Sequence, residues 1–140
     1  MIENLNFIYP EIFISLSIMF LLLLGVFKKN SSSLIYNLSI IFLIFSLALI
    51  FNYPPKSNLY LFNNSYAIDY FSIFMKILTL CSGIFVLVAS SKYLKIFKIF
   101  QIEYSILILC SILGMMVMIS SYDLIVFYVG LELQSLSLYV

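Results

Sequence analysis

The sequence lacks His, Trp and Arg, and it has only two Cys and few charged residues of either sign. Seven Lys nearly balance six acidic residues, so the net charge is +1 and nothing indicates a nucleic-acid partner. Cys81 and Cys110 stand in separate apolar runs without CxxC spacing, which argues against a metal site or a disulfide framework. No Gly-rich phosphate loop or nucleophile–base pair is present. We therefore expect no bond-making chemistry and no metal or cofactor bound by this chain.

Apolar side chains are what the sequence has in abundance. Hydrophobic residues make up 64% of the 140 residues and charged residues only 9%, whereas about a quarter is charged in soluble domains. Runs such as 38–51 and 77–89 are apolar nearly all round, without the polar stripe of a helix on a soluble core. The composition therefore predicts an integral membrane protein with lipid contacts.

Turn signals divide the chain into five apolar runs, at about 10–27, 34–51, 68–91, 103–119 and from 123 onward. Each approaches or exceeds the roughly 17 residues that cross the hydrocarbon as a helix. Pro10 suits a first helical turn, and Pro54–Pro55 cannot continue a helix. The sequence predicts an all-α integral membrane protein with five transmembrane helices.

The lysines give these spans an orientation. Two follow the first span and three lie between the third and fourth, whereas only Lys56 lies in a connection on the other side. The positive-inside rule then places the N-terminus outside. Acidic Glu3 and Glu11 argue against a signal peptide, and no Arg-rich transit peptide is present. Because the residue bias is that of AT-rich genes, we expect the mitochondrial inner membrane, with the N-terminus toward the intermembrane space; a bacterial inner membrane is the alternative.

Glu132 is the leading candidate for a functional residue. It lies about 13 Å beyond Asp123 along a helix, near the midplane of the bilayer, where a charge costs about 2.5–3.5 kcal/mol. Tyr128 and Ser135 share its helical face and bear hydroxyls that can bond the carboxyl or order a water. The residues support two interpretations equally: a carboxyl that loads and releases a proton, and a neutral acid hydrogen-bonded between helices.

Lys76 is the second intramembrane charge. It follows Asp69 by about 10 Å on the same helical face, so its side chain is expected to reach toward the outer interface and Asp69. A transport role is the less favoured interpretation. Spans three and five run in the same direction, which also leaves a direct pair between Lys76 and Glu132 open.

Small and terminal residues have packing explanations. Cys110 and Gly114 form a small-xxx-small patch for close helix contact, and Ser82–Gly83 can serve similarly. Asp123 can cap the fifth helix, and Glu103 favours the start of the fourth.

The whole chain resembles the antiporter-like membrane subunits of respiratory complex I, of the type called subunit 2 in mitochondria and subunit N in bacteria. The specific part is the C-terminal third: Ser120-Ser121-Tyr122-Asp123-Leu124, followed by Gly130-Leu131-Glu132-Leu133-Gln134-Ser135-Leu136-Ser137-Leu138-Tyr139-Val140. Tyr9-Pro10-Glu11-Ile12 and the segment from Asp69-Tyr70-Phe71 to Lys76 are similar but less specific.

The resemblance implies a fourteen-helix protein with two inverted five-helix repeats, of which residues 1–102 supply three preceding helices and 103–140 the first two of a repeat. It implies that Glu132 pairs with a lysine on the seventh helix and passes protons inward. Quinone reduction elsewhere in a complex that uses NADH, FMN, iron–sulfur clusters and ubiquinone would drive this transfer. Because this sequence stops at Val140, we expect a fragment or, preferably, a split subunit. A separate chain would then supply the remaining helices and the lysine, beside other complex I membrane subunits and lipids.

Two other functions stay open. One is a related cation/proton antiporter or membrane hydrogenase subunit. The other is a membrane scaffold in which Glu132 only locks helices together.

Overall fold

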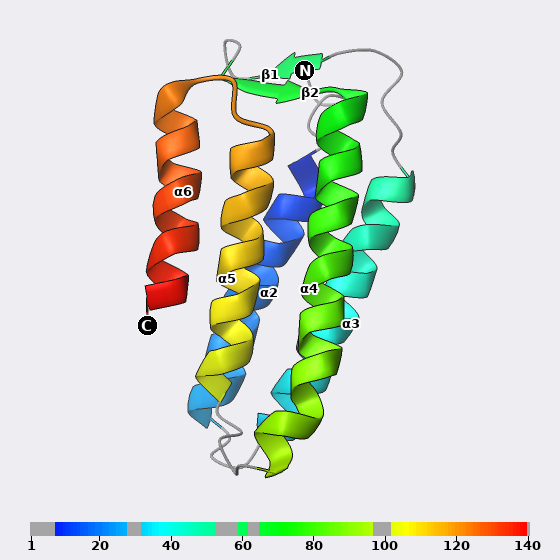
Figure 1. Ribbon diagram of the computed structural model, residues 1–140, viewed down its shortest axis with the longest axis vertical. Helices are drawn as coiled ribbons and strands as arrows, with labels where there is room; N and C mark the ends of the chain where they lie inside the picture. The colour runs from blue at the N-terminus through cyan, green and yellow to red at the C-terminus, as the bar shows by residue number, and fades with distance from the viewer. Residues whose placement is uncertain (1–7, 28–31, 53–58, 62–64, 97–101, 140) are drawn as a thin grey trace.

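The computed structural model describes residues 8–27, 32–52, 59–61, 65–96 and 102–139. Five helices run up and down beside one another, and a short hairpin lies across one end of the bundle (Figure 1). In chain order the elements are α2 (Tyr9–Phe27), α3 (Ser32–Asn52), β1 (Leu59–Leu61), β2 (Tyr66–Ile68), α4 (Tyr70–Ile96), α5 (Ile102–Ile119) and α6 (Leu124–Tyr139). The predicted all-helical membrane fold is confirmed.

The helix boundaries agree closely with the apolar runs. Pro10 is the second residue of α2, as its missing N–H allows, and α3 ends at Asn52. The predicted Pro54–Pro55 stop lies outside the described residues. Helix α4 extends five residues beyond the predicted end at Ser91, because exposed residues such as Lys92 and Tyr93 continue a helix past the apolar run.

Four helices are long and apolar enough to cross a bilayer: α2, α3, most of α4, and α5. Helix α6 has 16 residues, so it is about 24 Å long and shorter than the hydrocarbon thickness of about 30 Å. In Figure 1 it ends well above the lower ends of the other helices. The ends of α2 and α4, which precede the two predicted lysine-rich connections, lie together at the lower end of the bundle.

The hairpin was not predicted. Strands β1 and β2 pair antiparallel, with Leu59 opposite Ile68 and Leu61 opposite Tyr66. Sequence reasoning interpreted 52–67 as a polar connection and began the third span at Ile68, which is instead the last residue of β2. Three-residue strands carry too little alternation to be recognised.

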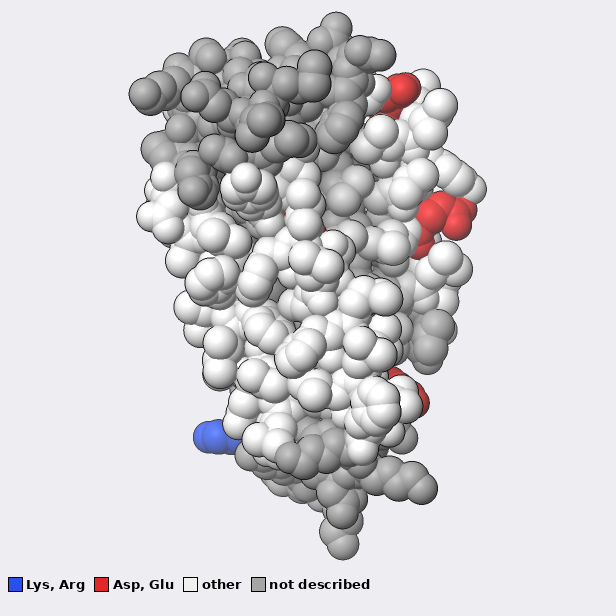
Figure 2. All heavy atoms as spheres, turned by 180° about the vertical axis from the view of Figure 1, so that it is seen from behind, with Lys and Arg blue, Asp and Glu red and all other residues white. Residues whose placement is uncertain are grey.

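The core lies along the axis of the bundle, between α2, α3, α4 and α5. Its fully buried large side chains include Ile14, Leu21, Leu43, Leu87 and Leu109. The outer surface is also apolar, with Phe27, Val26 and Phe85 more than 70% exposed. Figure 2 shows a face that is mostly uncharged, with acidic side chains mainly along its right-hand edge. Such a surface needs lipid or other apolar helices around it.

Hydroxyl groups inside the helices are satisfied locally. Ser17, Ser39 and Ser46 are buried, and each donates a hydrogen bond of 2.7–2.8 Å to the backbone carbonyl three residues earlier. In a hydrocarbon environment no water can replace such a partner, so local bonds let serine occupy the interior.

Glycines set the closest helix contact, between α5 and α6. A Cβ on Gly114 would lie 2.8 Å from the Gly130 carbonyl oxygen, and one on Gly130 would lie 2.9 Å from the Met118 backbone nitrogen. The predicted close-packing role of Gly114 is therefore confirmed. Gly83 similarly admits Ile112 of α5 against α4, whereas neighbouring Ser82 is exposed.

Candidate functional site

Among the described residues there is one ion pair between side chains, and it is buried in the bundle near the hairpin end. Lys76 Nζ lies 2.5 Å from Glu11 Oε1, and the two side chains are 3% and 7% exposed. Glu11 is the third residue of α2 and Lys76 the seventh of α4, and both helices begin at the hairpin end (Figure 1). Opposite charges inside a membrane bundle are expected to pair in this way.

Tyr66 of β2 completes this cluster. Its hydroxyl donates a 2.7 Å hydrogen bond to Glu11 Oε1 and accepts a 3.2 Å bond from Lys76 Nζ. Lys76 Nζ also lies 5.2 Å from the centre of the Tyr66 ring, within range of a cation–π interaction. Burial and the neighbouring Glu11 carboxylate raise the pKa of Tyr66, so the phenol stays protonated and able to donate.

Two polar atoms beside this cluster are buried without a hydrogen-bond partner: Glu11 Oε2 and Ser120 Oγ. The Ser120 hydroxyl lies close enough to the Tyr66 phenol to lower the pKa of Tyr66, but the two form no hydrogen bond of good geometry. The single oxygen Oε1 therefore accepts from both Lys76 and Tyr66, and this fixes the orientation of the carboxylate.

Lys76 has neither of the partners that the sequence suggested. It is 2% exposed, so it does not extend to the outer interface, and it pairs with Glu11 rather than with Asp69 or Glu132. Asp69 instead directly precedes α4: its backbone N–H donates to Ser72 Oγ, and its carbonyl accepts from the same hydroxyl. The prediction failed because spacing along one helix cannot reveal an acid on another helix.

Glu132 lies at the ninth of the sixteen positions of α6, about 12 Å from its start. The side chain is half-buried, and its Oε1 accepts a hydrogen bond from the hydroxyl of Tyr128, one turn earlier. Within the described residues no cation pairs with it. The predicted contact with Tyr128 is thus confirmed.

Ser135 does not bond the Glu132 carboxyl directly. Its hydroxyl donates 3.1 Å to the backbone carbonyl of Glu132 and not to the carboxyl. Ser135 and Gln134 line a shallow groove of about 240 Å³ with three apolar side chains, Leu131, Leu138 and Tyr139. The groove lies on the half of α6 beyond Glu132.

Sequence reasoning missed Glu11 and Tyr66 as members of a charged site. A usable signal existed for Glu11: it is an acid inside an apolar span, near the same membrane side as Lys76. Tyr66 carried none, because its position depends on the unpredicted hairpin.

The fold and these charges define a polytopic helical membrane protein with ionisable groups inside its spans. NADH-quinone oxidoreductase subunit N of Pelagibacter ubique is 67% identical over 138 residues, which is 99% of this chain and 29% of that protein. The subunit N proteins of Bartonella bacilliformis and Ruthia magnifica are 43% and 37% identical, over 99% and 93% of this chain. No protein-family model matches the chain.

The chain is therefore similar over nearly its whole length to NADH-quinone oxidoreductase subunit N proteins. It spans under a third of the length of the curated relatives it matches, 29%, 28% and 27% for these three. Those relatives are bacterial, so they lend no support to the mitochondrial location and favour the bacterial alternative. AT-rich coding bias does not by itself distinguish an organelle from a bacterium.

Proposed function

We propose that this chain is part of the membrane arm of a proton-translocating NADH–quinone oxidoreductase, in which Glu132 takes up and releases protons. The observation that carries the proposal is a half-buried carboxyl in the middle of an apolar helix, with a phenol donor and no paired cation among the described residues. An acid at that depth faces protein or water and is retained for function.

Tyr128 is proposed to hold the Glu132 carboxyl in place, since its hydroxyl donates directly to Oε1. Ser135, whose hydroxyl donates to the Glu132 backbone carbonyl and which lines the groove, is proposed to order a water beside the carboxyl. Lys76 is the weaker candidate for proton transfer, because its ammonium is already neutralised by Glu11.

The partners follow from the family. We propose that the lysine partner of Glu132 and the helices completing the half-channel belong to the part of subunit N that this sequence does not cover, supplied by a separate chain if the subunit is split. Other membrane subunits of the complex and lipids cover the remaining apolar surface. We propose that NADH, FMN, iron–sulfur clusters and quinone are bound elsewhere, since Cys81 and Cys110 are on different helices and the sequence has no His.

The proposed location is a bacterial inner membrane. Bacterial relatives and four apolar helices of spanning length support it. The lysine distribution supports an orientation with the hairpin end and the N-terminus outside.

A second candidate function is that of a cation/proton antiporter or of a membrane hydrogenase subunit, which would use the same carboxyl. The names of the relatives do not support it. A scaffold is the third candidate, favoured by the tight glycine contact that holds α6 on α5. These alternatives predict different behaviour when the carboxyl is neutralised.

The test is Glu132→Gln in the complete complex, reconstituted into vesicles. The amide keeps the size of the side chain and can still accept from Tyr128, so assembly and quinone reduction should persist while protons translocated per electron pair fall. The matched control is Glu103→Gln, which makes the same change at an exposed residue in the first turn of α5. It should leave the proton ratio at the wild-type value.

Three outcomes would decide against the proposal. An assembled Glu132→Gln complex with an undiminished proton ratio would remove the proton role of this residue. Failure of assembly in Glu132→Gln, with normal assembly of Glu103→Gln, would favour the scaffold. Normal transfer of sodium or potassium against protons, independent of quinone, would favour the antiporter.

A further inference from the structure

The buried cluster of Glu11, Lys76 and Tyr66 has no part in the proposed proton role of Glu132. Its three members come from β2, from α4, which follows β2 directly, and from α2, which lies far from both in the sequence. All three residues are buried, with Lys76 2%, Glu11 6% and Tyr66 8% exposed as whole residues. A pair of charges so far from water is strongly held, because removing either partner leaves the other unpaired in a medium of low dielectric constant.

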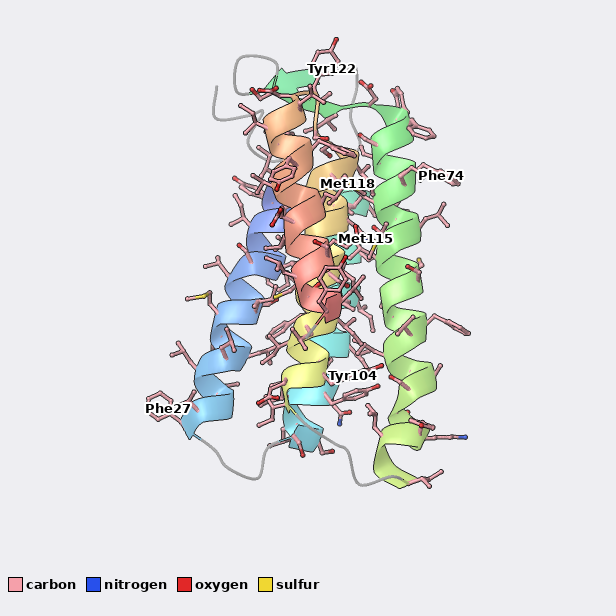
Figure 3. The ribbon with its side chains drawn as sticks, turned by 60° about the vertical axis from the view of Figure 1, so that its left-hand side comes forward. Phe27, Phe74, Tyr104, Met115, Met118 and Tyr122 are labelled. Carbon is pink, nitrogen blue, oxygen red and sulfur yellow. The ribbon has the colours of Figure 1, made fainter. Side chains whose placement is uncertain are left out.

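The ion pair holds the side chain of Tyr66, and the backbone around Tyr66 bonds to the turn between α5 and α6. Tyr66 forms an isolated antiparallel bridge with Ser121, in the turn between α5 and α6. Ala67 N–H donates 2.9 Å to the Ser120 carbonyl, and Tyr122 N–H donates 3.0 Å to the Ser65 carbonyl. Figure 3 shows Tyr122 at the hairpin end of the bundle, above Met118 of α5.

Helix α6 begins two residues after Tyr122, and among the described helices it packs extensively only against α5. Gly130 is its only buried residue among 124–139, at the contact with α5. Contact with one neighbouring helix does not by itself fix the start of α6 relative to α2 and α4. The hydrogen bonds from β2 to residues 120–122 supply a second attachment, at the start of α6.

We propose that Glu11, Lys76 and Tyr66 are positioning residues for Glu132: the ion pair holds the Tyr66 phenol, and Tyr66 holds β2 against the turn that starts α6. The expected effect on proton transfer rests on the proposed function of Glu132, but the attachment of α6 through Tyr66 does not. A loosened start of α6 moves Glu132 relative to the rest of the bundle. Proton transfer is sensitive to such movement, since donor and acceptor must stay within hydrogen-bond reach.

Simple packing is the competing explanation, and it makes a different prediction. Buried ion pairs can be replaced by apolar residues of similar volume without loss of stability. The double variant Glu11→Leu/Lys76→Met would then be neutral if only packing mattered. In the proposed arrangement it removes the acceptor of the Tyr66 hydroxyl, so α6 should loosen although the bundle stays folded.

The experiment measures the position of α6 in the complete complex. Spin labels are attached at Leu124→Cys on α6 and Tyr70→Cys on α4, both exposed residues at the hairpin end, after Cys81 and Cys110 are replaced by Ala. The width of the distance distribution between the labels reports the mobility of α6, and proton translocation per electron pair is measured on the same variants without labels.

Tyr66→Phe and Glu11→Leu/Lys76→Met are both expected to broaden the distribution and lower the proton ratio. The matched control is Tyr36→Phe, which deletes a buried hydroxyl that bonds the Leu87 carbonyl in the other half of the bundle. It should leave both quantities unchanged. Distributions as narrow as wild type in Tyr66→Phe or in the double variant would overturn the inference. If the distributions broaden while Glu132→Gln still pumps normally, the positioning stands and the proposed role of Glu132 fails.

Discussion

The contact between α5 and α6 gives the sharpest prediction from the structure. Replacing Gly114 with Ala adds a Cβ that would lie 2.8 Å from the Gly130 carbonyl oxygen and 2.8 Å from the Gln134 backbone nitrogen. Both atoms belong to backbone, so neither can rotate away. Ordinary contacts of a Cβ begin at 3.4 Å, so α6 must move outward by roughly 0.6 Å, the difference between these two distances.

The free energy of this change combines two opposing effects. Ala favours a helix over Gly by about 1 kcal/mol, whereas overpacking a close contact costs about 1–3 kcal/mol. The backbone clash is the larger effect here, and the movement also separates α6 from α5, its main neighbour among the described helices. We expect Gly114→Ala to weaken attachment of α6 and to lower the proton ratio of the complex.

Gly25→Ala is the matched control. It has the same gain in helix propensity, but the added Cβ would lie 3.1 Å from Ile102 Cγ2, the end of a side chain that can adjust. The measurement is the temperature at which half of the chain has dissociated from the detergent-solubilised complex. Gly114→Ala should lower this midpoint and Gly25→Ala should leave it unchanged or raise it. Equal midpoints in the two variants would refute the reasoning.

Two further predictions follow from the tyrosines. The pKa of Tyr66 is raised above its ordinary value of 10.0, so its phenol stabilises the fold fully below about pH 10. This stabilisation is lost as the pH rises further, because the phenol then ionises in the unfolded chain but not in the folded one. Ultraviolet difference spectra of wild type against Tyr66→Phe should therefore show no tyrosinate from this residue near pH 10. Tyr36 donates to the Leu87 carbonyl and lies 3.0 Å from Ser90 Oγ, so Tyr36→Phe should cost about 0.5–1.5 kcal/mol, detectable as a lower dissociation midpoint with an unchanged proton ratio.

Most of the fold was predictable from the sequence because lipid imposes a simple rule. A segment that crosses the hydrocarbon must be apolar and helical over about 17 residues or more, and this pattern is visible in runs such as 10–27 and 103–119. The Glu132–Tyr128 contact was predictable for a related reason, since residues four apart meet on one helix. The hairpin escaped prediction because its strands are three residues long.

The sequence by itself determined that this protein lies in a membrane, which segments form its long helices, and that Glu132 is an acid deep in an apolar helix. Those properties depend on the local order of residues along the chain. Only the tertiary structure decided that Lys76 pairs with Glu11, that Tyr66 joins them, and that Gly114 meets Gly130. These contacts join residues between 10 and 65 positions apart, and which helices become neighbours is set by the packing of all the elements together.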